Sequence, residues 1–176
     1  DTVDFASRLQ KVGVYGYVET DLLAFTQNVQ LTSIRLKQAP RLQSLLGIET
    51  LTCLEGLPIA GAQRLHDFGP LGSRPATHLR ELRFEACGGV TTLEDVKHQT
   101  GLRKLWVANC GNIESLQPII ALSDLEVLYM WESTRIADGD LAPLLQLGHL
   151  RDLRLMNRKH YSPSVAQIKQ RLGLTG

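Results

Sequence analysis

The chain has 176 residues, of which 43% are hydrophobic, and a formal net charge of +1. This length and composition predict a single folded unit that buries one core, and a nearly neutral charge gives no overall field for nucleic acid or an anionic membrane. No apolar run approaches the length of a membrane span and no signal-peptide pattern is present, so membrane insertion is not expected.

A hydrophobic pattern recurs along the chain, with apolar residues at its first, fourth and sixth positions. The copies begin at Leu9, Leu31, Leu51, Leu79, Leu102, Leu125 and Leu150. The last four are 23, 23 and 25 residues apart. Alternation over positions four to six is the period of a short strand with one buried face. About seven stacked repeats are enough to bury a continuous core, because each repeat contacts mainly its neighbours.

The segments between the predicted strands differ in character. Leu51 and Leu79 are 28 residues apart, and the Gly- and Pro-rich stretch 68–75 predicts an irregular loop that lengthens this repeat. Apolar residues at every third position over 113–122 predict a short, tight helical turn. Asp140 is the expected N-cap of another short helix, and Asp21 stands in the matching place of an earlier repeat.

The end of the chain predicts a capping helix over 162–176, after a repeat array over 1–161. Ser162 is the expected N-cap, Pro163 the first helical residue and Gly173 the closing residue. An apolar stripe is expected to cover the last repeat, because terminal repeats need a polar outer face. The stripe consists of Val165, Ile168 and Leu172.

This pattern resembles the leucine-rich repeat superfamily over nearly the whole chain. The segment 112–125, with Pro118 in its turn, is similar to the internalin type of bacterial repeat. The resemblance implies an α/β fold: a right-handed solenoid with a curved parallel sheet on its concave face and short helices and turns on its convex face. The asparagine usual at the ninth position is replaced by Tyr17, Ala39, Ile59, Cys87, Cys110 and Ser133.

The three cysteines predict neither a metal site nor a disulfide framework. Cys87 and Cys110 share one repeat position and are expected in the core, whereas Cys53 falls on a predicted strand. No Cys-x-x-Cys pair occurs, and an odd, sparse set favours a reducing compartment, so a cytoplasmic location is favoured over secretion. Catalytic glycine, serine and histidine motifs are also missing, so neither an enzyme nor a cofactor is predicted.

Functional information is expected where the strands turn residues outward on the concave face. The fifth-position column contains Gly13, Arg35, Glu55, Arg83, Trp106, Tyr129 and Arg154. The seventh-position column contains Tyr15, Lys37, Leu57, Glu85, Ala108, Trp131 and Met156. Both tryptophans of the chain fall in these columns. Exposed aromatics with arginines at the rim are typical of interaction hot spots, although aromatics also pack across open sheets without any ligand.

The candidate partner-binding site is the aromatic part of this face. It comprises Arg83, Glu85, Trp106, Tyr129, Trp131, Glu132, Arg154 and Met156. The predicted function is non-catalytic protein–protein recognition, with another protein or other domains of a longer parent chain as partner.

Two alternatives remain open from the sequence. The chain starts at Asp1 without a methionine, which fits a ligand-sensing or regulatory segment of a larger signalling ATPase-type protein. Nucleic acid or a phosphorylated ligand could use the basic C-terminal repeats, through Arg151, Arg154, Arg158 and Lys159. Glu126, Glu132 and Asp152 interrupt that basic surface, which disfavours nucleic acid.

Overall fold

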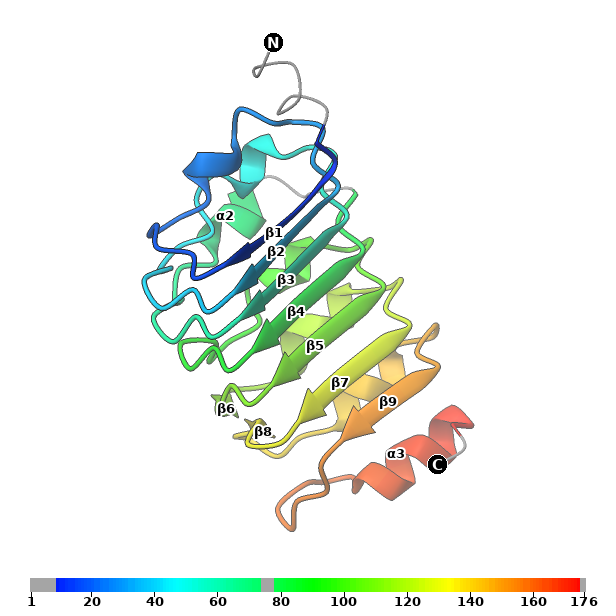
Figure 1. The fold of residues 1–176 in the computed structure, drawn as a ribbon. Helices are drawn as coiled ribbons and strands as arrows, with labels where there is room; N and C mark the ends of the chain where they lie inside the picture. Colours follow the sequence, from blue (N-terminus) through cyan, green and yellow to red (C-terminus); the bar gives the residue numbers. More distant parts are fainter. Residues whose placement is uncertain (1–8, 74–77, 175–176) are drawn as a thin grey trace.

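A computed structural model describes residues 9–73 and 78–174 and contains one parallel sheet of seven strands (Figure 1). Parts of the predicted array (1–8), of the predicted loop (74–77) and of the predicted capping helix (175–176) lie outside the described residues. The strands, in spatial and chain order, are β1 (Lys11–Tyr15), β2 (Ser33–Lys37), β3 (Gly56–Ala60), β4 (Glu81–Glu85), β5 (Lys104–Ala108), β7 (Val127–Trp131) and β9 (Asp152–Leu155).

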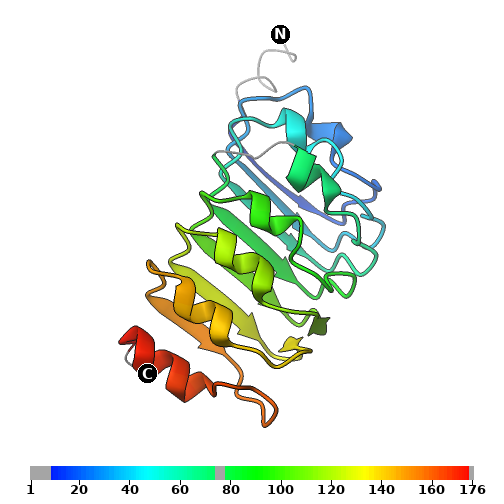
Figure 2. The ribbon, with the colours of Figure 1, turned by 180° about the vertical axis from the view of Figure 1, so that it is seen from behind.

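Short helical segments cover one face of this sheet and leave the other uncovered (Figures 1 and 2). They are η1 (Leu23–Phe25), η2 (Ile48–Thr50), α2 (Gly69–Ser73), η3 (Val96–His98), η4 (Gln117–Ala121) and η5 (Ala142–Gln146). The two-residue strands β6 (Asn112–Ile113) and β8 (Arg135–Ile136) form a small second parallel sheet. The predicted α/β solenoid is confirmed. The uncovered side of the large sheet, which was predicted as the concave side, is called the open face below.

The core lies between the sheet and the helical segments. In β4, Leu82 and Phe84 are completely buried while Arg83 between them is exposed, as the two-residue period of a strand requires. The same alternation holds in β2, β5, β7 and β9. The first, fourth and sixth positions therefore form continuous apolar rows through the stack, which no single repeat could bury alone.

The third repeat is displaced by three residues from its predicted position. Leu57 pairs with Leu82 and Ile59 with Phe84 across β3 and β4, so the repeat begins at Leu54 rather than Leu51. Leu57 and Ile59 are buried core residues, which corrects their assignment to the seventh and ninth positions. Glu55 precedes the strand, and its predicted place in the fifth-position column belongs to Pro58. The matching seventh position is occupied by Ala60.

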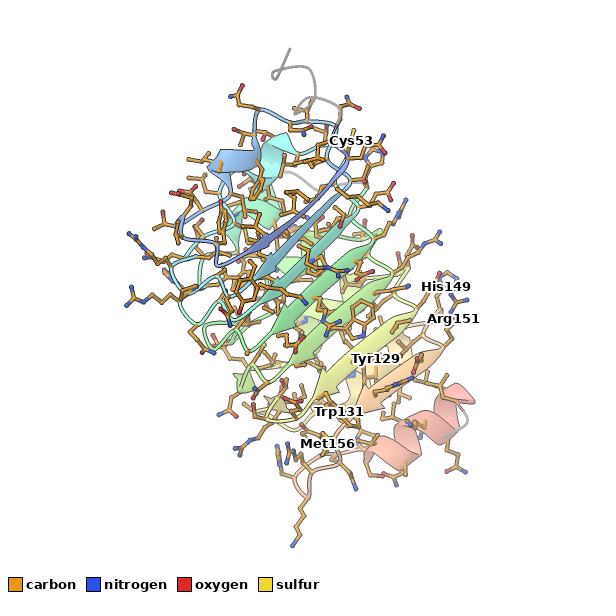
Figure 3. All side chains as sticks on the ribbon, in the orientation of Figure 1. Cys53, Tyr129, Trp131, His149, Arg151 and Met156 are labelled. Atoms are coloured by element: carbon orange, nitrogen blue, oxygen red, sulfur yellow. The ribbon has the colours of Figure 1, made fainter. Side chains whose placement is uncertain are left out.

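Two further predictions change with this register. The spacing from Leu54 to Leu79 is 25 residues, equal to that from Leu125 to Leu150, so the third repeat has no unusual insertion. The described part of the predicted loop contains helix α2, which packs between η2 and η3 as the equivalent helical segment. Cys53 lies in the turn before β3 and not on a strand (Figure 3).

A residue with positive φ follows each of the first six strands of the large sheet. These residues are Gly16, Gln38, Gly61, Ala86, Asn109 and Glu132, with φ between 51° and 72°. In four of them the amide donates to the carbonyl of the last residue of the next strand, as Ala86 does to Ala108 at 2.9 Å. The left-handed conformation thus ends each strand and turns the chain away from the sheet.

Side-chain oxygens begin the return segment at similar places in six repeats. Asp21, Ser44, Asp67, Thr92, Ser115 and Asp140 each accept a hydrogen bond from the amide two residues later, at 2.8–3.2 Å. Asp140 accepts from Ala142 at 2.8 Å, but the N-cap of η5 is Leu141, which corrects the predicted N-cap. Such turns supply acceptors to amides that a short helix leaves unpaired.

The ninth position is buried in the repeats that carry cysteine. The Cys110 thiol lies 3.2 Å from the Ala108 carbonyl oxygen, and the Cys87 thiol lies 3.4 Å from that of Glu85. In the next repeat Ser133 is exposed, and Thr134 is the buried residue whose hydroxyl accepts from the Cys110 amide at 3.1 Å. The two cysteine thiols and the Thr134 hydroxyl therefore stand where the asparagine ladder would lie. In the repeat that begins at Leu125 the buried residue at this place is Thr134, and not Ser133 as predicted from the sequence.

Helix α3 (Val165–Leu172) closes the C-terminal end and packs against η5. Val165 and Ile168 are buried and Leu172 is partly buried, as the predicted stripe requires. The N-cap is Ser164 and not Ser162, because its side chain and that of Gln167 form a reciprocal capping box. Pro163 accordingly precedes the helix, and Gly173 ends it in the left-handed conformation with φ 68°.

Candidate protein-binding site

The open face carries a hollow of about 400 Å³ over β4, β5 and β7, which we call the aromatic hollow. Its lining residues are Arg83, Glu85, Trp106, Ala108, Tyr129, Trp131, Glu132 and Arg154. Seven of the eight residues predicted from the sequence are therefore brought together. Ala108 is the added member, and its small side chain leaves space between the larger neighbours.

The aromatic rings and the arginines of the fifth-position column form one continuous row. Trp106 and Tyr129 are register partners on β5 and β7, and their rings meet edge to face with centroids 5.7 Å apart. The Arg83 guanidinium carbon lies 5.8 Å from the Trp106 ring centre. The Arg154 guanidinium carbon lies 4.6 Å from that of Tyr129. Each ring thus has a cation over it, an arrangement that holds exposed aromatic side chains in defined positions.

Carboxylates fix the two ends of this row. The Tyr129 hydroxyl donates a hydrogen bond to Asp152 on the next strand, and this bond raises the pKa of the Tyr129 hydroxyl. Asp152 also lies 3.5 Å from Nε of Arg154. At the other end, Arg83 and Glu85 form an ion pair at 2.6 Å. The row is therefore oriented by interactions that exist before any partner arrives.

Trp131 is the most exposed aromatic residue of the hollow, with 47% of its surface accessible. Its register partner on β5 is Ala108, which leaves one side of the ring uncovered. In Figure 3, Tyr129 and Trp131 lie along β7 and Met156 lies just beyond the end of β9. Met156 is half-buried and does not line the hollow, although the sequence placed it in the site. Glu132 lies at the rim, where its backbone carbonyl accepts from Arg158 at 2.7 Å.

A second hollow of about 480 Å³ lies over β1 to β4, and we call it the N-terminal hollow. Tyr15, Arg35 and Lys37 line one side, and Glu81, Arg83 and Glu85 line the other. Its floor includes Pro58, Ala60 and Gly61. Sequence reasoning missed this hollow because the displaced third repeat put Glu55 and Leu57 where Pro58 and Ala60 stand. The small side chains of the correct register were the signal that could have revealed it.

Two kinds of feature are absent from the described part of the chain: a side-chain cluster able to hold a metal ion, and a helix able to span a membrane. None of the described residues form a group of three or more His, Cys, Asp or Glu side chains able to hold a metal ion. No helix within residues 9–73 and 78–174 is long and apolar enough to span a bilayer.

Comparison with known proteins places this fold. No protein-family model and no curated protein matches the sequence. An internalin from Listeria monocytogenes matches with a TM-score of 0.63 and 20% identity, over 89% of this chain and 42% of that one. Internalin C2 from the same organism gives a TM-score of 0.66 and 20% identity, with coverage of 89% and 68%. A leucine-rich repeat protein from Leptospira interrogans gives 0.50 and 16%, with coverage of 85% and 49%.

The fold is thus a leucine-rich repeat solenoid. Within that class it is similar to internalins, and its 3₁₀ segments η4 and η5 each begin with a proline at one of the first two positions. The chain spans 42% of the length of the first internalin, so the likeness describes this array and not the whole of that protein. Solenoids of this class present extended surfaces on which other molecules bind.

Proposed function

We propose that the chain is a non-catalytic protein-recognition module that binds its partner at the aromatic hollow. The observation that carries this proposal is the row Arg83, Trp106, Tyr129 and Arg154, with Trp131 exposed beside it. Exposed apolar surface on an ordered, pre-arranged row is typical of an interface centre, where a few aromatic and arginine side chains supply most of the binding energy. Another protein, or another domain of a longer parent chain, is the corresponding partner.

The state of the arginines supports a protein partner over nucleic acid at the C-terminal repeats. Arg151 pairs with Glu126, and Arg154 contacts Asp152 and Tyr129. Arg158 donates to the Glu132 carbonyl. To bind phosphates, these arginines would have to give up the contacts that they already make within the chain. The neighbouring carboxylates also weaken the local positive potential.

A capture experiment with a matched control tests the proposal. Wild type, Trp106→Ser/Trp131→Ser and Leu23→Ser are immobilised and exposed to nuclease-treated lysate of the source cells, after thermal melts show that all three fold. Leu23 is the control because it is 49% exposed, slightly more than Trp131 at 47%, and lies on η1 away from the open face.

The expected result is a lysate protein that wild type and Leu23→Ser retain and the tryptophan variant does not. After purification, this lysate protein should bind wild type again. Retention by all three proteins would contradict the proposed site and place binding elsewhere on the chain.

A further inference from the structure

The open face has a distinct charge pattern at its N-terminal end. The outward-facing residues of β1, β2 and β3 include Lys11, Arg35 and Lys37, and no carboxylate is among them. Among the described residues, none of these three cations forms an ion pair. This differs from the other end of the face, where Arg83 and Arg154 are both held by carboxylates. Arg35 and Lys37 are therefore available to a ligand.

The carboxylates that face these cations stand on the far wall of the N-terminal hollow. Glu85 is engaged with Arg83, while Glu81 has Lys104 as its register partner on β5. Both carboxylates lie on β4, two strands from Arg35 and Lys37 on β2. With neighbouring strands about 4.8 Å apart, they stand close to a Debye length away and leave the potential at β2 positive.

The two hollows are neighbours along the sheet and share a border. Both are lined by Arg83 and Glu85, so the ion pair on β4 forms a low ridge between them. A single extended segment could therefore lie across the sheet and contact both hollows. The pair at the ridge carries no net charge, and it opposes neither sign of ligand at the crossing point.

We propose that the open face binds an extended polypeptide segment that places acidic side chains over Arg35 and Lys37 and an apolar side chain in the aromatic hollow. This inference rests on the proposed function and specifies its partner. From β2 to β5 and β7 are three and four strand spacings, about 14 to 19 Å. At about 3.3 Å per extended residue, the acidic and apolar side chains of the ligand stand about four to six residues apart.

A peptide fits this surface better than a nucleic acid. A polyanion needs a run of cations along its backbone, whereas Glu81, Glu85, Glu132 and Asp152 interrupt the cations over the rest of the open face. A segment with a local acidic cluster followed by an apolar anchor matches both the unpaired cations and the aromatic hollow.

The test uses a displayed library of random peptides about twelve residues long, long enough to span both hollows. Peptides are selected on the wild-type chain and counter-selected on Trp106→Ser/Trp131→Ser, so that survivors require the aromatic hollow. Their affinities are then measured by tryptophan fluorescence with peptides that lack Trp. The signal is specific, because the chain has only two tryptophans and both line this hollow.

The charge contribution is isolated by matched variants. Arg35→Glu/Lys37→Glu should weaken binding about tenfold at low salt, and the difference should shrink as salt rises. Arg35→Gln/Lys37→Gln should show a smaller loss of the same kind. Lys169→Glu/Arg171→Glu on α3 is the control, because it changes the net charge equally at residues that line neither hollow.

The inference is supported if survivors carry Asp or Glu about four to six residues from an apolar anchor, and if they lose affinity with the β2 variants but not with the α3 variant. It is overturned by survivors without acidic preference, by equal affinities for the β2 and α3 variants, or by a library that yields no survivor. Displacement of the peptides by a tighter-binding oligothymidylate would also overturn it, in favour of nucleic acid. The proposed function is judged separately, by the capture experiment.

Discussion

The guanidinium group of Arg154 lies over the ring of Tyr129 on the neighbouring strand, 4.6 Å from its centre. Asp152, two residues before Arg154, accepts a hydrogen bond from the Tyr129 hydroxyl and also contacts the Arg154 guanidinium. Three side chains on two strands therefore hold one another in place at the edge of the aromatic hollow. A partner meets a surface that is already arranged, which reduces the ordering cost of binding.

A double-mutant cycle of Arg154→Met and Tyr129→Leu should reveal this contact in the free energy of unfolding. We expect a coupling of about 0.5–1 kcal/mol, the usual range for an exposed cation–π pair. Urea unfolding of the four proteins measures it. The cycle is repeated in an Asp152→Asn background, because Asp152 contacts both residues. A coupling of zero in both backgrounds would show that the stacked geometry does not persist in solution.

Replacing Ile168 with Asp should destabilise the chain strongly. Ile168 is a fully buried residue of helix α3, and a carboxylate there would lose its water without gaining a partner. We expect a loss of more than about 3 kcal/mol, seen as a lower urea midpoint. Gln170→Asp is the control, since Gln170 is exposed on the same helix and should change stability little. Equal midpoints for both variants would contradict the capping role of α3.

Ala86→Gly should stabilise the chain, although glycine in a folded segment usually destabilises it. Ala86 has a φ of 51°, which costs an L-residue about 1–2 kcal/mol. The greater freedom of glycine in the unfolded chain offsets about 0.4–1 kcal/mol of that gain. We therefore expect a net increase of up to about 1.6 kcal/mol in the free energy of unfolding measured in urea.

The control for this prediction is Ala108→Gly in strand β5, whose backbone lacks a positive φ. It should lower stability by about 0.5–1 kcal/mol, so the two alanine-to-glycine changes should have opposite signs. Losses of the same size at both positions would mean that the left-handed turn at Ala86 stores no strain.

Tyr17 should make stability fall at alkaline pH. Burial raises the pKa of the Tyr17 hydroxyl from 10.0 to about 12, with smaller contributions from the charges of Asp21 and Glu19. The folded chain then holds this proton more tightly than the unfolded chain. The neutral hydroxyl therefore stabilises the fold below pH 10, and this contribution is lost as pH rises through about 12.

Urea unfolding between about pH 9 and 12 measures this effect. Tyr17→Phe should show a shallower loss of stability than wild type over that range. Tyr15→Phe is the control, because Tyr15 is 72% exposed on β1 and its hydroxyl contributes little to the fold. If Tyr17→Phe and Tyr15→Phe follow the same pH profile as wild type, the burial of the Tyr17 hydroxyl is not linked to stability.

The sequence was sufficient to predict the solenoid and most of the aromatic hollow. Trp106 and Tyr129 each stand between two core-facing apolar residues in strands with a clear two-residue period. The alternation alone therefore predicts that their side chains point to the open face. The cations over their rings depend on rotamers and on carboxylates of the next strand. Those distances could not be read from repeat positions, and the omission of Ala108 and the inclusion of Met156 reflect this.

The third repeat was misplaced for a specific physical reason. Leu51, Leu54 and Leu57 are spaced by three, so either pair satisfies the first and fourth positions of the pattern. Pro58 argues against a repeat that begins at Leu54, because that register places proline inside a central strand and proline has no amide N–H to donate to the neighbouring strand. In the structure the β2–β3 ladder pairs Ser33 with Gly56 and resumes at Leu36 and Ile59, passing over Pro58. Gly61 with its positive φ, at the same position as Gly16, was the signal that identifies the repeat.

Strand β4 acts as a spacer of fixed width between the two hollows, since its Arg83–Glu85 pair borders both. The unit that contains it, from Leu79 to the residue before Leu102, contacts mainly the units on either side. Duplicating this unit would move the hollows apart by one further strand, about 4.8 Å, which is the reach of roughly one and a half extended residues. The number of repeats between the hollows would then determine the spacing between the acidic and apolar side chains of a peptide that the surface can bind.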